Sequence, residues 1–230
     1  MTKALVFDTG PLISFAMNNL YWVIRQLKEK YKGDFYITES VKRECVDRPL
    51  TSKKFKYEAL QNLKLIQDNV IKVYKNPELK DKTLSLLKLS NSLFKAKGSY
   101  VKNVQYAEME SVIAAKLLNA DAIVIDEFVT RSLIENSLKV KKRMEKKFHT
   151  KIEVDNDNLN KFKKEISNIR VIRSFELVTV AYELGFFKEY YLKLPEPKKT
   201  LLEGLLWGIK LNGCSVSEQE IKEIMKIESF

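Results

Sequence analysis

The sequence predicts an α/β fold with a central parallel sheet of about five strands. Short apolar segments rich in β-branched residues alternate five times with segments whose apolar residues recur at helical spacing. Such alternation is typical of strand–helix–strand units, in which consecutive strands lie parallel. Two of the apolar segments also end on an aspartate, Asp8 and Asp126. The carboxyl ends of parallel strands lie at one edge of a sheet, where ligands bind.

The first half of the chain contains three of the predicted strands, at residues 4–8, 34–38 and 70–74. Pro11 suits the first turn of the helix after the first strand, where its missing N–H costs nothing. Pro49 ends the helix after the second strand. The helices expected here cover residues 12–30, a segment carrying Val41, Glu44 and Val46, residues 55–67, and residues 77–97 up to Gly98.

The second half is organised around residues 105–132. An acid-bearing helix leads through a short turn into a strand at 121–126, and a further helix starts at Phe128. A fifth strand is expected at 169–172, followed by a helix that begins at Ser174. We therefore predict one domain over residues 1–189, with a basic insertion at 138–168, and a helical extension over residues 190–230.

Composition narrows the classes of function. The chain of 230 residues has a net charge of +11, which favours a polyanionic partner such as nucleic acid. It has no apolar run near the ~20 residues that span a bilayer and no signal-peptide pattern, so we expect a cytoplasmic protein without a membrane partner. One histidine and two distant cysteines, Cys45 and Cys214, argue against a zinc site.

Each candidate acid has an ordinary structural explanation. Asp8 and Asp126 could cap the helices that follow them, and Glu44 could be a solvated helical side chain. Glu108 and Glu110 could simply favour the positive end of a helix, and because they lie about 200° apart only one can face a given site. Periodicity does not choose between these two. Taken together, however, the acids converge on one sheet edge and predict a site for a hard divalent cation.

Four motifs carry a resemblance to a known family. They are Val6 to Ile13, Ile37 to Glu44, Ala107 to Glu110, and Ile125 to Glu127. In order and spacing they resemble the PIN domain over residues 1 to about 187, in a variant with A-E-M-E where G-E-A-E is usual. The resemblance implies a three-layer α/β/α sandwich that cleaves single-stranded RNA with Mg²⁺ or Mn²⁺.

The resemblance also implies roles for particular residues. Catalytic and metal-binding roles would fall to Asp8, Glu44, Glu108 and Asp126, and auxiliary roles to Thr9, Glu110 and Glu127. The expected function is a metal-dependent endoribonuclease acting on rRNA or mRNA. The alternatives are a toxin nuclease paired with a small antitoxin and a non-catalytic RNA-binding or scaffold protein. PIN-like proteins are often dimers, so the resemblance also allows a homodimer, and the oligomeric state stays open.

The basic residues suggest where RNA would lie. Residues 138–151 carry six lysines and one arginine against one glutamate, and Lys141, Lys142 and Arg143 lie at their centre. Because an acidic site repels phosphate, we expect this segment to bind the RNA backbone, unless it is merely a solvated helix. Arg131 and Arg173 lie closer to the expected cleft and are predicted to contact phosphate.

Overall fold

A five-stranded parallel sheet forms the centre of the molecule, which confirms the predicted α/β fold. The computed structural model describes residues 3–228. The sheet order is β3-β2-β1-β6-β8, and all four pairings are parallel. Its strands are β1 (Ala4–Phe7), β2 (Asp34–Ile37), β3 (Lys72–Val73), β6 (Ala122–Val124) and β8 (Val171–Ile172).

The sheet register brings the two strand-end aspartates to adjacent positions. In β1 and β6, Leu5 pairs with Ala122 and Phe7 with Val124. The Asp8 N–H continues this ladder by donating to the Val124 carbonyl at 3.0 Å. Asp8 and Asp126 therefore follow neighbouring central strands at the same sheet edge, as the sequence predicted.

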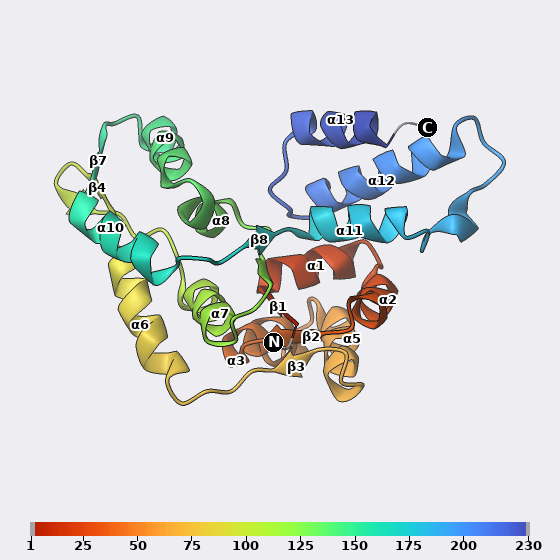
Figure 1. Cartoon of the computed structure of the whole chain (residues 1–230), viewed down its shortest axis with the longest axis horizontal. Coiled ribbons are helices and arrows are strands. Elements are labelled where there is room, and N and C mark those ends of the chain that lie inside the picture. The colour runs from red at the N-terminus through yellow and green to blue at the C-terminus, as the bar shows by residue number, and fades with distance from the viewer. Residues whose placement is uncertain (1–2, 229–230) are drawn as a thin grey trace.

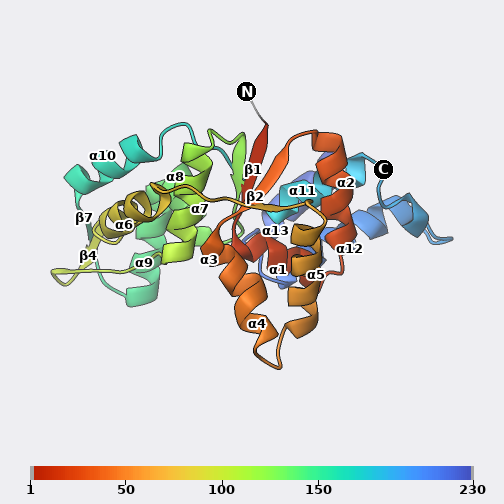
Figure 2. The ribbon, with the colours of Figure 1, turned by 90° about the horizontal axis from the view of Figure 1, so that it is seen from below.

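Alternate residues of the central strands point into two hydrophobic cores. Leu5, Phe7 and Val124 belong to the core under α1 (Thr9–Met17), α2 (Tyr21–Tyr31) and α11 (Ser174–Glu183). Val6 and Ile123 belong to the core under α7 (Tyr106–Leu117). Successive side chains of a strand point to opposite faces, so a strand that is buried on both faces must be apolar throughout. Figures 1 and 2 show the sheet between these two helical layers, with α7 on one side of β1 and α1, α2 and α11 on the other.

The helices follow the predicted order with several changed boundaries. They are α1 (Thr9–Met17), α2 (Tyr21–Tyr31), α3 (Glu39–Lys42), the π-helix η1 (Arg43–Asp47), α4 (Arg48–Leu50), α5 (Lys56–Gln67), α6 (Leu79–Ser90), α7 (Tyr106–Leu117), α8 (Phe128–Glu135), α9 (Ser137–Phe148), α10 (Asn156–Glu165), α11 (Ser174–Glu183), the 3₁₀-helix η2 (Lys188–Tyr190), α12 (Pro197–Leu211) and α13 (Glu218–Ile227). The single helix predicted at 12–30 is wrong, because the chain breaks it at Asn19, whose φ is 56°.

A second, antiparallel sheet was not predicted. Its strands are β4 (Phe94–Ala96), β5 (Ser99–Tyr100) and β7 (Ile152–Val154), in the order β5-β4-β7. The helix expected at 77–97 therefore ends early, at Ser90. This sheet joins the basic insertion to the region before α7 and lies away from the central sheet, beside α9 and α10 (Figure 1).

The C-terminal helices share the core of the main domain. Leu202, Leu206 and Ile209 of α12 and Ile221 of α13 are buried in the same cluster as residues of α1 and α11. Figure 1 shows α12 and α13 stacked on α11. The predicted extension is thus helical and packs directly on the domain. Within residues 3–228, no helix combines the length and apolar character needed to cross a bilayer.

Candidate functional site

Asp8 lies at the centre of the group of acids. It follows β1 and occupies the N-cap position of α1, yet its carboxylate makes no capping hydrogen bond to that helix. Its side chain is buried, and the nearest hydroxyl, Ser111 Oγ, donates to Asp8 Oδ1 at 3.4 Å. Burial, followed by repulsion from Glu44 and Asp126, raises the pKa of Asp8 to about 7. The capping alternative is therefore not realised.

Glu44 reaches this centre from the helical segment after β2. It belongs to the π-helix η1, whose wider turn is a feature often found at functional sites. Thr9, the residue after Asp8, donates from Oγ1 to Glu44 Oε2 at 2.7 Å. The hydroxyl of Thr9 thus holds the Glu44 carboxylate beside the β1 edge, and the auxiliary role predicted for Thr9 stays a prediction.

The structure separates Glu108 from Glu110. Glu108 lies in the first turn of α7, where Oε2 accepts from the Gln105 N–H at 2.9 Å and from Thr130 Oγ1 at 3.1 Å. Burial, followed by the nearby Asp8 and Glu127, raises the pKa of Glu108 to about 7. Glu110 instead accepts from the Ser40 N–H of α3 at 3.0 Å. Of the two glutamates, Glu108 is the one beside Asp8.

Asp126 has a full set of hydrogen-bond donors. Its Oδ2 accepts from Ser14 Oγ and Ser174 Oγ, both at 2.6 Å, and its Oδ1 accepts from the Ser174 N–H at 2.8 Å. The side chain is 1 % exposed. Its carboxylate therefore ties α1 and α11 to the end of β6, and the metal-binding role predicted for it stays a prediction.

Glu127 takes the capping position that was considered for Asp126. Its two carboxylate oxygens accept from the N–H groups of Val129 at 2.8 Å and Thr130 at 2.7 Å. These bonds satisfy two free donors at the start of α8. Glu127 thus orients α8, and Thr130 of the same turn reaches Glu108.

The acids offer oxygen ligands of the kind that Mg²⁺ and Mn²⁺ prefer. Asp8, Glu44 and Glu108 fit such an ion chemically, because burial and, to a smaller extent, neighbouring carboxylates raise the pKa values of Asp8 and Glu108, and a cation would offset both effects. Their side chains are not preassembled around a common point. Among residues 3–228, no three His, Cys, Asp or Glu side chains are grouped closely enough to hold a metal ion.

A basic cavity of about 370 Å³ lies on one side of the acids. Lys102, Arg143 and Lys147 line it together with Glu127. The Arg143 guanidinium lies over the ring of Phe128, 4.4 Å from its centroid, which fixes it beside the start of α8. The segment predicted to bind RNA thus contributes part of a cavity at this edge. Lys141, by contrast, lies 3.8 Å from Glu145, and Lys142 is exposed.

A second cavity, of about 280 Å³, lies on the other side. Arg43 and Arg48 line it with Glu44 and Ala107. No ion pair among residues 3–228 involves either arginine. Sequence reasoning missed both, although their position on either side of Glu44 in one helical segment was visible. Each of the two cavities therefore combines one acid, Glu127 or Glu44, with cations.

Arg131 and Arg173 are engaged within the chain. Arg131 pairs with Glu135 at 3.2 Å and donates to the Ser215 carbonyl. Arg173 is 8 % exposed and pairs with Glu176 and with Glu220, the latter at 2.7 Å. Both guanidinium groups attach the C-terminal region to the sheet edge, and their predicted contact with phosphate stays a prediction.

Comparison of the chain with models of protein families, with curated proteins and with solved structures finds no match in any of the three. The resemblance to PIN domains therefore depends on the four sequence motifs.

Proposed function

We propose that this chain is a metal-dependent endoribonuclease that cleaves phosphodiesters of single-stranded RNA. The observation that carries the proposal is the position of Asp8. It is a buried carboxylate at the end of a central strand, accompanied by Glu44 and Glu108. Two cavities lined by cations adjoin Glu44 and Glu127.

Each residue has a role in the proposed reaction. Asp8, Glu44 and Glu108 would hold Mg²⁺ or Mn²⁺, while Thr9 orients Glu44 and Thr130 orients Glu108. The bound ion would polarise a phosphoryl oxygen and lower the pKa of the attacking water. The cations of the two cavities would bind phosphates of the strand on either side and offset the repulsion from the carboxylates.

The test compares RNA cleavage by wild type and by Asp8→Asn. A labelled single-stranded RNA is incubated with Mn²⁺ or with EDTA, and cleavage is followed on a gel. We expect cleavage by wild type with Mn²⁺ only, and a loss of about a hundredfold or more in Asp8→Asn, the range for removing one group that stabilises a transition state. The matched control is Asp157→Asn, an exposed aspartate on α10. Equal cleavage by both variants would contradict the role of Asp8.

A second candidate is a non-catalytic RNA-binding protein. Two observations favour it: Asp126 already has three hydrogen-bond donors, and no three acidic side chains among residues 3–228 are preassembled for a metal ion. The same incubations separate the two candidates. A non-catalytic RNA-binding protein would leave the RNA intact in both Mn²⁺ and EDTA, and it would bind the RNA equally well in both.

A further inference from the structure

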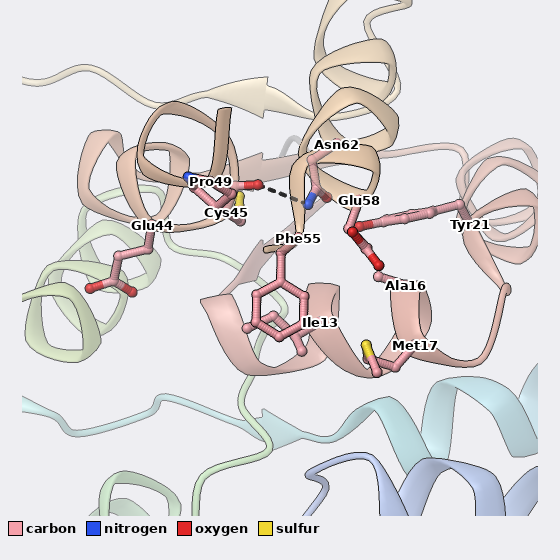
Figure 3. A pocket seen from close by; sticks show the side chains of 10 residues that line it. All are labelled: Ile13, Ala16, Met17, Tyr21, Glu44, Cys45, Pro49, Phe55, Glu58 and Asn62. Carbon is pink, nitrogen blue, oxygen red and sulfur yellow. Dashed lines mark hydrogen bonds between the residues drawn. The ribbon is translucent and has the colours of Figure 1, made fainter. Parts of the chain in front are cut away.

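A small apolar pocket opens beside Glu44, between α1, η1 and α5. Figure 3 shows the Phe55 ring beside Ile13 of α1, with Met17 next to them and Glu44 at one end. The enclosed part is about 60 Å³, which holds a few waters or the edge of a planar ring. The rim is apolar and accessible, since Phe55 is 41 % and Met17 46 % exposed.

Two polar atoms at the base of this pocket have no hydrogen-bond partner. They are the Tyr21 hydroxyl and Asn62 Oδ1, on side chains that are only 7 % and 4 % exposed. Asn62 Nδ2 donates to the Cys45 carbonyl at 3.2 Å, which fixes the orientation of the amide and leaves Oδ1 as an acceptor. Neither atom is open to solvent, so they close the base of the pocket, and the acceptor that a ligand can reach is the carboxylate of the partly exposed Glu58.

Phe55 is held in an unusual conformation at the rim. Its φ is 62°, which is rare for a bulky residue and is often found where a side chain serves a function. The Lys54 ammonium lies 4.6 Å from the centroid of its ring. Lys53 and Lys56 are also exposed, so the segment combines an aromatic face with three cations. Stacking on an aromatic ring and charge contacts to the backbone are how proteins bind single-stranded nucleic acids.

We propose that this pocket binds one nucleobase of the RNA strand, next to the site of cleavage. The base would stack on Phe55, and its edge would reach the Glu58 carboxylate. The neighbouring phosphates would contact Lys53, Lys54 and Lys56. This inference rests on the proposed function, because it assumes that single-stranded RNA lies along the Glu44 side of the site.

The polar groups of the pocket also select the class of base. The Glu58 carboxylate is an acceptor, so it suits a base that presents an exocyclic amino group. Adenine, cytosine and guanine present such a group, whereas uracil presents carbonyl oxygens on both sides of its single N–H. The pocket therefore prefers adenine, cytosine or guanine to uracil.

The experiment measures binding in EDTA, so that it does not depend on cleavage. The probe is a short single-stranded RNA carrying one 2-aminopurine, whose fluorescence is quenched when it stacks on an aromatic ring. We expect quenching by wild type and its loss in Phe55→Ala, together with roughly tenfold weaker binding. Tyr57→Ala is the matched control, since it removes a 70 % exposed aromatic residue two positions away.

A second variant tests base selection without removing the aromatic ring. Glu58→Gln keeps the shape of the side chain but replaces an acceptor with a donor, so the preference for oligo(A) and oligo(C) over oligo(U) should narrow. A merely structural role of Glu58 would change affinity for all three equally. Two results would overturn the pocket proposal. The first is that Phe55→Ala behaves like Tyr57→Ala, which is expected if water or a protein partner fills the pocket. The second is that oligo(U) binds wild type as tightly as oligo(A).

These results are separable from those on cleavage. Quenching that depends on Phe55 in a protein that cleaves no RNA would support the pocket and refute the nuclease. Metal-dependent cleavage with unchanged binding by Phe55→Ala would refute the pocket alone.

Discussion

Asp8 and Asp126 end adjacent strands of one sheet, but their surroundings differ. Asp126 accepts three short hydrogen bonds, from Ser14 and from the hydroxyl and N–H of Ser174. Asp8 has a 3.4 Å contact from Ser111 and lies near Glu44 and Glu108. The strand-end position brings both carboxylates to the edge, and the neighbouring side chains give them different surroundings there.

The difference follows from the cost of burying charge. A buried polar group costs free energy unless hydrogen bonds compensate it, and burial raises the pKa of a carboxyl group. Three donors surround Asp126, which connects α1, β6 and α11. Asp8 has one weak donor, and burial, followed by repulsion from Glu44, raises its pKa, which makes it the better candidate for binding a cation.

The largest expected effect is the loss of stability when Asp126 is replaced. Asp126→Ala would leave the buried donors of Ser14 and Ser174 without an acceptor, so the free energy of unfolding should fall by about 3 kcal/mol. Urea denaturation followed by circular dichroism measures this change. The exposed control Asp157→Ala should change it little, and a comparably small loss for Asp126→Ala would show that these bonds contribute little.

A smaller effect is expected from Asp8, which should make the stability of the protein depend on pH. Its pKa is about 7 in the folded protein and 3.8 as an ordinary aspartate, so the folded state binds more protons between these values. The stability of the metal-free protein should therefore fall as the pH rises from about 4 to about 7. Asp8→Asn should weaken this fall and stabilise the protein at pH 8 by about 2 kcal/mol relative to wild type.

Melting temperatures in EDTA at several pH values test this expectation. Glu108→Gln should act in the same direction, because the pKa of Glu108 is raised to about 7 as well. Mn²⁺ at pH 8 should stabilise wild type more than Asp8→Asn. A wild-type stability that does not change between pH 4 and pH 7 would mean that the Asp8 carboxylate is not penalised by its surroundings.

The smallest expected effect is on the salt dependence of RNA binding, through the cations that line the cavities. Replacing Lys102, Arg143 and Lys147 with Ala removes the cations of the larger cavity, and the slope of log K against log salt for RNA should decrease by about 2. The matched control replaces Lys139, Lys142 and Lys146 with Ala. These lysines are exposed positions of α9, the helix that also carries Arg143 and Lys147. An equal change in both triple variants would show that RNA responds to the total charge of α9 and not to the cavity.

The sequence by itself determined the architecture and the strand-end position of Asp8 and Asp126. Apolar segments and helical spacing are local properties, so the five strands and their parallel arrangement were predictable. The break at Asn19 and the small second sheet were missed. A single left-handed residue can end a helix without changing its apolar pattern, and the strands of the second sheet are only two or three residues long.

The roles of the acids were decided only by the tertiary structure. The donors to Asp126 come from Ser14 and Ser174, 112 and 48 residues away in sequence. Glu108 was distinguished from Glu110 by Thr130 of α8 and Ser40 of α3. A carboxylate at the end of a strand looks the same in sequence whether distant donors or other acids surround it. Its ionisation and its capacity for a metal depend on those long-range neighbours, which only the packing of the helices around the sheet brings into place.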